Sequence, residues 1–240
     1  MSGHSKWNNI KHKKEKTDAQ RAKVFTKIGK EIAMAVKAGG ADPASNSKLR
    51  DLIAKAKSLN VPNDNIDRVI NKAASSDSEN YESIFYEGYG PCGIAFIVEC
   101  TTDNRNRTSA DLRHYFDKFG GNLGTTGCVS YLFTDTGIII LDAEGVDEDA
   151  VMEAALEAGA DDIGLEEDTF EVLTPPAELY NVKDALESAG YRVLSTEEAK
   201  IPSTFVNLSD EEAVIKMQKL IDALDDNEDV QNYWHNWENE

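Results

Sequence analysis

The stretch GIIILDAEGVDEDAVMEAALEAG at residues 137–159 decides how the second half of the chain folds. Residues 137–142 form an apolar run of strand length, and Asp147–Ala158 predicts a helix that Gly159 ends. A strand, a helix and a further strand follow, at Thr169–Leu173, Pro175–Ser188 and Tyr191–Leu194. Residues 134–203 therefore have the order β-α-β(-β)-α-β, which is typical of a ferredoxin-like domain.

The segments on either side of this domain are each incomplete α/β pieces. Residues 78–133 offer a strand, a helix and a strand, at Ile94–Thr101, Ser109–Phe119 and Val129–Phe133. The tail offers a helix from Ser209 to about Leu224 and a strand at Val230–Trp237. We therefore expect the ferredoxin-like domain, 134–203, to be inserted within a discontinuous α/β middle domain made of residues 77–133 plus 204–240.

The first 76 residues predict a basic domain of three helices. The first helix starts at a capping box formed by Thr17 and Gln20 and stops at Gly39-Gly40; the others span Ser47–Leu59 and Asn63–Ala74. The predicted fold class is therefore α+β, with an N-terminal three-helix module followed by two small α/β domains, one ferredoxin-like and inserted in the other.

The charge of the helical domain is opposite in sign to that of the rest of the chain. Residues 1–72 contain 16 Lys and Arg against 7 Asp and Glu, a net charge of +9, whereas residues 73–240 contain 9 against 37, a net charge of −28. Opposite signs indicate a basic module with its own partner joined to an acidic body. The alternative is that the basic part simply docks on the acidic part.

A basic arm and a lysine stripe are the candidate nucleic-acid surface. Lysines of the first helix lie within about 80° of one another, roughly opposite its apolar face, and the arm before it adds an indole. Lysines neutralise phosphates and an indole stacks on an unpaired base, although a lysine stripe alone is most often only a solvated face. The candidate residues of arm and stripe are Lys6, Trp7, Lys11, His12, Lys13, Lys14, Lys16, Lys23, Lys27 and Lys30.

The polar loop TTDNRNRT at 101–108 adds two further candidates, Arg105 and Arg107. It joins a predicted strand to a predicted helix, so it could form an anion site at the helix N-terminus. A helix cap with local ion pairs explains the same residues equally well. Both interpretations stay open.

No motif supports catalysis or a bound cofactor. The glycines at 88–93 satisfy GxGxxG but include Pro91 and lead into a strand, and those at 120–127 lack the Gly-Lys-Ser/Thr of a phosphate loop. None of the four histidines has zinc-ligand spacing, and the carboxylates are scattered. We expect a non-enzyme with no catalytic residue, no cofactor, no metal and no small-molecule substrate.

The chain also lacks signals for export or membrane insertion. No run approaches the length of a spanning helix, and the polar, basic N-terminus has no apolar core of a signal peptide. Three sparse cysteines suit a reducing compartment. These features predict a soluble cytoplasmic protein without a membrane partner.

Several strings together resemble the YebC/PmpR family. They are GHSKW at 3–7, AGGADP at 38–43, YEGYGP at 86–91, TDNRNRT at 102–108 and GGNLG at 120–124. Cys92 stands where the pattern suggests glycine, and Cys128 where it suggests a small hydroxyl residue. The resemblance implies a three-domain cytoplasmic protein without enzymatic activity, and family members are described as probable DNA-binding transcriptional regulators. The family also includes a mitochondrial translational activator, and bacterial members have been linked to ribosomes stalled on proline-rich sequences.

The predicted function is therefore non-enzymatic, nucleic-acid-binding regulation of gene expression, with DNA as the partner of a transcriptional regulator. The alternative is a translation factor that associates with ribosomal RNA or the ribosome. No helix rich in Arg, Asn and Gln suggests base readout in a major groove, and lysine dominance favours phosphate contact. A third hypothesis is a protein-interaction adaptor.

Overall fold

The computed structural model describes residues 18–75, 80–166 and 168–238. Its described residues form two compact units. One unit contains residues 18–129 and 208–235, and the other contains residues 130–207 and 236–238. The second unit thus interrupts the sequence of the first.

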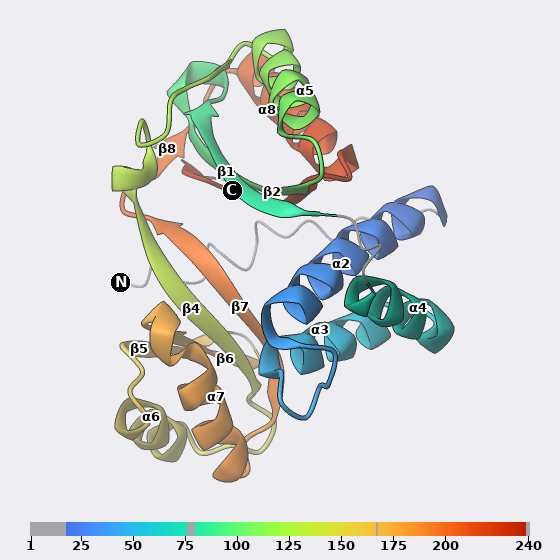
Figure 1. Cartoon of the computed structure of the whole chain (residues 1–240). Coiled ribbons are helices and arrows are strands. Elements are labelled where there is room, and N and C mark those ends of the chain that lie inside the picture. The colour runs from blue at the N-terminus through green and yellow to red at the C-terminus, as the bar shows by residue number, and fades with distance from the viewer. Residues whose placement is uncertain (1–17, 76–79, 167, 239–240) are drawn as a thin grey trace. The chain divides into compact units, whose positions relative to one another are not determined.

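Three helices open the first unit: α2 (Asp18–Gly39), α3 (Ser47–Ser58) and α4 (Asn63–Ala74) (Figure 1). They share one apolar core, which includes Ile32 and Leu49. The helices predicted at 47–59 and 63–74 are confirmed almost to the residue, whereas the capping box predicted at Thr17 lies outside the described residues.

Asn46 ties the turn between α2 and α3 together. Its side-chain oxygen accepts a hydrogen bond from the amide of Leu49 (3.0 Å) and so caps α3. Its amide nitrogen donates to the carbonyls of Ala35 (2.9 Å) and Gly40 (2.8 Å). One buried side chain therefore satisfies backbone groups at the end of one helix and the start of the next.

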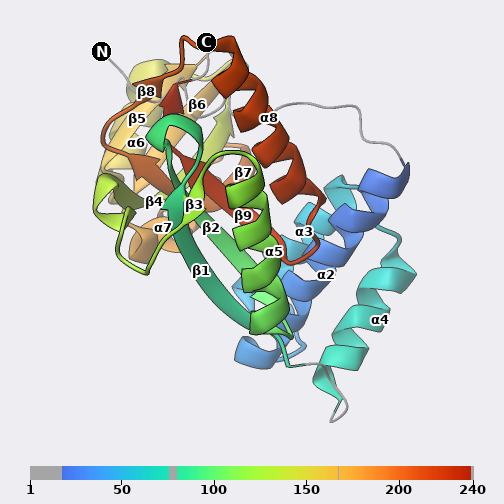
Figure 2. The ribbon, with the colours of Figure 1, turned by 90° about the horizontal axis from the view of Figure 1, so that it is seen from above.

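The same unit continues with an antiparallel sheet in the order β3-β1-β2-β9. Its strands are β1 (Glu82–Tyr89), β2 (Ala95–Thr102), β3 (Asn122–Leu123) and β9 (Val230–His235). Two helices, α5 (Arg105–Lys118) and α8 (Glu211–Asp226), pack beside each other (Figures 1 and 2). The pairing of β2 with β9 joins residues on either side of the second unit.

The sequence analysis missed one long strand of this sheet and wrongly predicted another strand beside it. β1 was not predicted, because its burial follows neither strict alternation nor a continuous apolar run. The strand expected at 129–133 is instead a short 3-10 helix at Ser130–Leu132. The carboxylate of Glu87 accepts from the amides of Gly127 (2.8 Å) and Val129 (2.9 Å), which occupies backbone donors that a strand would need.

The second unit has ferredoxin-like topology. Its elements are β4 (Phe133–Asp142), α6 (Glu148–Glu157), β5 (Asp162–Glu166), β6 (Thr169–Thr174), α7 (Leu179–Ser188) and β7 (Val193–Pro202). The sheet order is β5-β6-β4-β7 and every pairing is antiparallel. Apolar residues of the sheet, such as Ile139 and Val172, share one core with Val151 of α6 and Val182 of α7.

A short parallel pair, β8 (Val206–Asn207) with β10 (Trp237–Glu238), completes this unit. The strand predicted at 230–237 is thus two strands, separated at Asn236. The predicted fold class, a helical module followed by two α/β parts with the ferredoxin-like part inserted, is confirmed.

Candidate functional site

Three lysines of α2 reach one acidic segment, residues 225–229 (DDNED), which ends α8 and precedes β9. Lys23 Nζ lies 2.9 Å from Asp226 Oδ1, and Lys27 Nζ donates to the carbonyl of Asp225 at 2.9 Å. Lys30 Nζ lies 2.6 Å from Asp229 Oδ1 and donates to the carbonyl of Glu228 at 3.0 Å. Most of the described lysine stripe is therefore in contact with this acidic segment.

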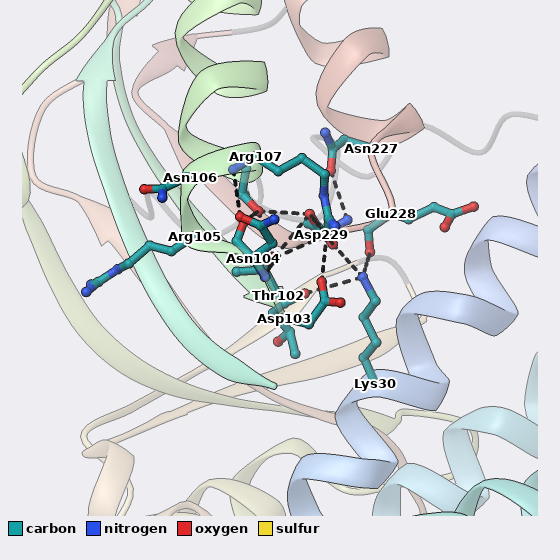
Figure 3. Close-up of polar contacts among 12 residues, drawn as sticks. Lys30, Thr102, Asp103, Asn104, Arg105, Asn106, Arg107, Asn227, Glu228 and Asp229 are labelled. Atoms are coloured by element: carbon teal, nitrogen blue, oxygen red, sulfur yellow. Dashed lines mark hydrogen bonds and ion pairs between the residues drawn. The ribbon is translucent and has the colours of Figure 1, made fainter. Parts of the chain in front are cut away.

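Asp229 is the centre of a buried polar cluster (Figure 3). Besides Lys30, its carboxylate accepts from Arg107 Nη2 (2.9 Å), Thr108 Oγ1 (2.8 Å) and Thr102 Oγ1 (3.3 Å). Burial alone would raise the pKa of Asp229, but the bonds from Lys30, Arg107 and Thr108 outweigh it and hold that pKa below its ordinary value. A carboxylate so saturated with donors is a poor general base, so its role is that of an anchor.

The segment 101–108 contains the end of β2, a two-residue connection and the first turn of α5. α5 begins at Arg105, with Asn104 as its cap accepting from the amide of Arg107 at 3.1 Å. The guanidinium of Arg107 pairs with Asp229 and with Asp103 (2.8 Å), and these hydrogen bonds raise its pKa. For Arg107 the geometry thus favours the helix cap with local ion pairs over the anion site.

Arg105 is oriented differently. Its side chain points away from the cluster (Figure 3) and is exposed. Within the described residues it makes no ion pair, so it stays open to an external anion.

Of the other predicted site residues, seven fall outside the described residues: Lys6, Trp7, Lys11, His12, Lys13, Lys14 and Lys16. Lys30 was expected on an exposed stripe, and it is buried instead. The helical period places it correctly on the side opposite the three-helix core, but that side packs on β2 and on residues 225–229. Lys30 Nζ also approaches the carbonyl of Thr101 there (3.4 Å). The periodicity of one helix cannot reveal that a segment distant in the sequence covers its outer face.

The sequence analysis missed a second group of cations, on α3. Lys48, Arg50 and Lys57 are exposed, and none pairs with a carboxylate elsewhere in the described chain. Lys55 of the same helix lies 3.4 Å from Glu31. The sequence does contain a signal for this group: the 12-residue helix has four cations and only one carboxylate, that of Asp51.

An open cavity of about 550 Å³ adjoins the Asp229 cluster. Its lining contains charges of both signs. The cations Lys30 and Arg107 line it, and so do carboxylates that include Asp103, Asp111 and Glu228. Among the described residues, no group of His, Cys, Asp or Glu is placed to hold a metal ion. The helices in the described ranges are also too short or too polar to span a bilayer.

These features define an α+β protein in which ion pairs join a basic helical module to an acidic segment of an α/β sheet domain. The chain belongs to the TACO1/YebC family. Residues 5–76 match the family model described as TACO1/YebC protein N-terminal domain, and residues 81–237 match that of the TACO1/YebC second and third domain. This agrees with the resemblance found in the sequence.

Relatives cover almost the whole chain. A protein of Acetivibrio thermocellus is 56% identical over 239 residues, covering 99% of both chains, and one of Ruminiclostridium cellulolyticum is 54% identical, covering 99% of this chain and 97% of its own. Both are named probable transcriptional regulatory protein. The crystal structure of a conserved hypothetical protein from Aquifex aeolicus is similar, with a TM-score of 0.82, 45% identity and 95% coverage of each chain.

Proposed function

We propose that this protein is a non-enzymatic, cytoplasmic regulator of gene expression that binds nucleic acid through its basic N-terminal part. The names of its relatives support regulation of transcription. The observation that carries the proposal is the distribution of charge: residues 1–72 hold a net charge of +9 in a chain whose total is −19. Nucleic acid is the common partner for such a module.

The cations available to phosphate are those without carboxylate partners. Among the described residues these include Lys48, Arg50 and Lys57 on α3 and Arg105 on α5. The predicted basic arm, residues 6–16, lies outside the described residues and is added from the sequence. Lysine predominates, and lysine contacts phosphate as a point charge without reading bases. We therefore expect binding that depends strongly on salt and weakly on sequence.

Charge reversal on α3 tests the surface. Lys48→Glu with Lys57→Glu should weaken binding of a labelled duplex or single strand at least tenfold, measured by fluorescence anisotropy between about 50 and 200 mM salt, and flatten the salt dependence by about two phosphate contacts. Lys118→Glu with Lys219→Glu changes the total charge equally on α5 and α8 and should have a much smaller effect. Equal losses in the two double variants would rule out α3 as the surface.

Ribosome association is the second candidate, favoured by the lysine-rich surface and by the −28 charge of the remainder, which resists lying along a duplex. Co-sedimentation of the full chain with ribosomes from DNase-treated lysate distinguishes it. Migration with ribosomal particles, lost on reversing Lys11, Lys13 and Lys14, would establish the translation role. Migration at the top of the gradient together with tight duplex binding would establish the transcriptional role.

A further inference from the structure

The acidic segment places carboxylate and carbonyl oxygens at three successive lysines of one helix face. Lys23, Lys27 and Lys30 are spaced by four and three residues, so their side chains lie along one side of α2. Each ammonium group donates to an oxygen of residues 225–229 at 2.6–3.0 Å. Phosphate oxygens would occupy the same positions around lysines bound to a nucleic-acid backbone.

The ion pairs of Lys30 and Lys23 differ in burial and in the number of supporting hydrogen bonds. The side chains of Lys30 and Asp229 are 10% and 7% exposed, and Asp229 is also held by Arg107 and Thr108. By contrast, Lys23 and Asp226 are 33% and 62% exposed and form a simple pair. An exposed pair contributes little and exchanges readily, whereas breaking a buried one is costly.

We propose that the acidic segment acts as an intramolecular competitor of nucleic acid, in which Asp226 occupies a phosphate position on Lys23 while the buried Lys30–Asp229 pair keeps the segment in place. Binding of a nucleic-acid backbone displaces Asp226 from Lys23 and leaves the Asp229 cluster intact. The partner is a phosphodiester backbone, recognised without base contacts. This inference rests on the proposed nucleic-acid binding.

Neutralising the competitor tests it. Asp226→Asn should raise the affinity for a fluorescein-labelled single-stranded RNA of about 20 nucleotides about threefold, because Lys23 is then free before binding. The slope of log affinity against log salt should steepen by about 0.7, the contribution of one further phosphate contact on a single strand. The matched control is Glu211→Gln, which removes one exposed carboxylate at the other end of α8.

The decisive comparison repeats both substitutions in a Lys23→Gln background. There Asp226→Asn should increase affinity no more than Glu211→Gln does, because its target is gone. A gain that persists without Lys23, or equals the control in the native background, overturns the competition while leaving nucleic-acid binding standing. Failure of every variant and of the native chain to bind at low salt overturns both the proposed function and this inference.

Discussion

At the scale of single residues, Glu171 in β6 is the most unusual side chain of the ferredoxin-like unit. It is 2% exposed, and neither carboxylate oxygen has a hydrogen-bond partner among the described residues. Burial, with smaller contributions from Glu166 and Glu197, raises its pKa to about 7. Near neutral pH the group therefore titrates inside the folded protein.

The direction in which the free energy of unfolding changes with pH follows from the pKa of Glu171 in the folded and unfolded states. An unfolded glutamate titrates near 4.3, so between about pH 4.5 and 7 the folded state holds a proton that the unfolded state has lost. Stability falls as pH rises through that window and levels off above it. Glu171→Gln should flatten this profile and stabilise the chain at about pH 8 by about 1 kcal/mol, because about 3 kcal/mol from the pKa difference exceeds about 2 kcal/mol for an unpaired amide.

Chemical unfolding followed at about pH 5 and pH 8 checks this prediction. Parallel pH profiles for the native chain and the variant would show that Glu171 does not titrate in the folded state. The sequence did not reveal this site. The segment at 169–173 was correctly predicted as a strand, but an alternating Phe-Glu-Val pattern ordinarily places the glutamate in water.

At the scale of elements, the contact of α2 with the acidic segment before β9 depends on Asp229. Asp229→Asn leaves Lys30 buried without a counter-charge, so we expect a loss of about 3 kcal/mol in the free energy of unfolding. Asp103→Asn removes the other, half-exposed partner of Arg107 and should cost less than about 1 kcal/mol. Urea unfolding of the two variants measures the difference, and equal costs would contradict an anchoring role.

Asn46 gives a second prediction at this scale. Asn46→Ala removes the cap of α3 together with two donors to the turn, so it should cost about 2 kcal/mol, above the typical cost of about 1 kcal/mol for one lost cap. Asn46→Asp keeps the acceptor and loses the donors, and its thermal midpoint should lie between those of the alanine variant and the native chain. A midpoint equal to that of the native chain would show that the two donated bonds contribute nothing.

Elements whose limits depend on local signals were predictable. α4 starts directly after Pro62 and follows its apolar spacing, so both ends matched. α5 begins four residues before the predicted Ser109, because Arg105–Thr108 are polar and read as a loop, although Asn104 is a good cap. The Lys30–Asp229 pair joins residues 199 apart, and no local pattern encodes such a contact.

At the scale of the whole molecule, the ferredoxin-like unit begins and ends at neighbouring points. Phe133 pairs with Pro202, and the amide of Ser203 donates to the carbonyl of Leu132 at 2.8 Å. Because residues 132 and 203 are already neighbours, two glycines are long enough to join them when residues 133–202 are removed. The shortened protein should unfold cooperatively and keep its nucleic-acid affinity within about threefold, because α3 lies in the remaining unit. Loss of cooperative unfolding would show that this unit depends on the insertion.

The pairing of β2 with β9 has a consequence for the order in which the molecule assembles during synthesis. Phe96 pairs with His235 and Lys30 with Asp229, so these contacts of β2 and α2 cannot form until residues 229–235 have been made. The four-stranded sheet β5-β6-β4-β7 of the ferredoxin-like unit, by contrast, has all its strands once Pro202 has left the ribosome. The sheet β5-β6-β4-β7 is thus the first α/β sheet that can be completed on the growing chain, while β2 keeps an unpaired edge until β9 has been made.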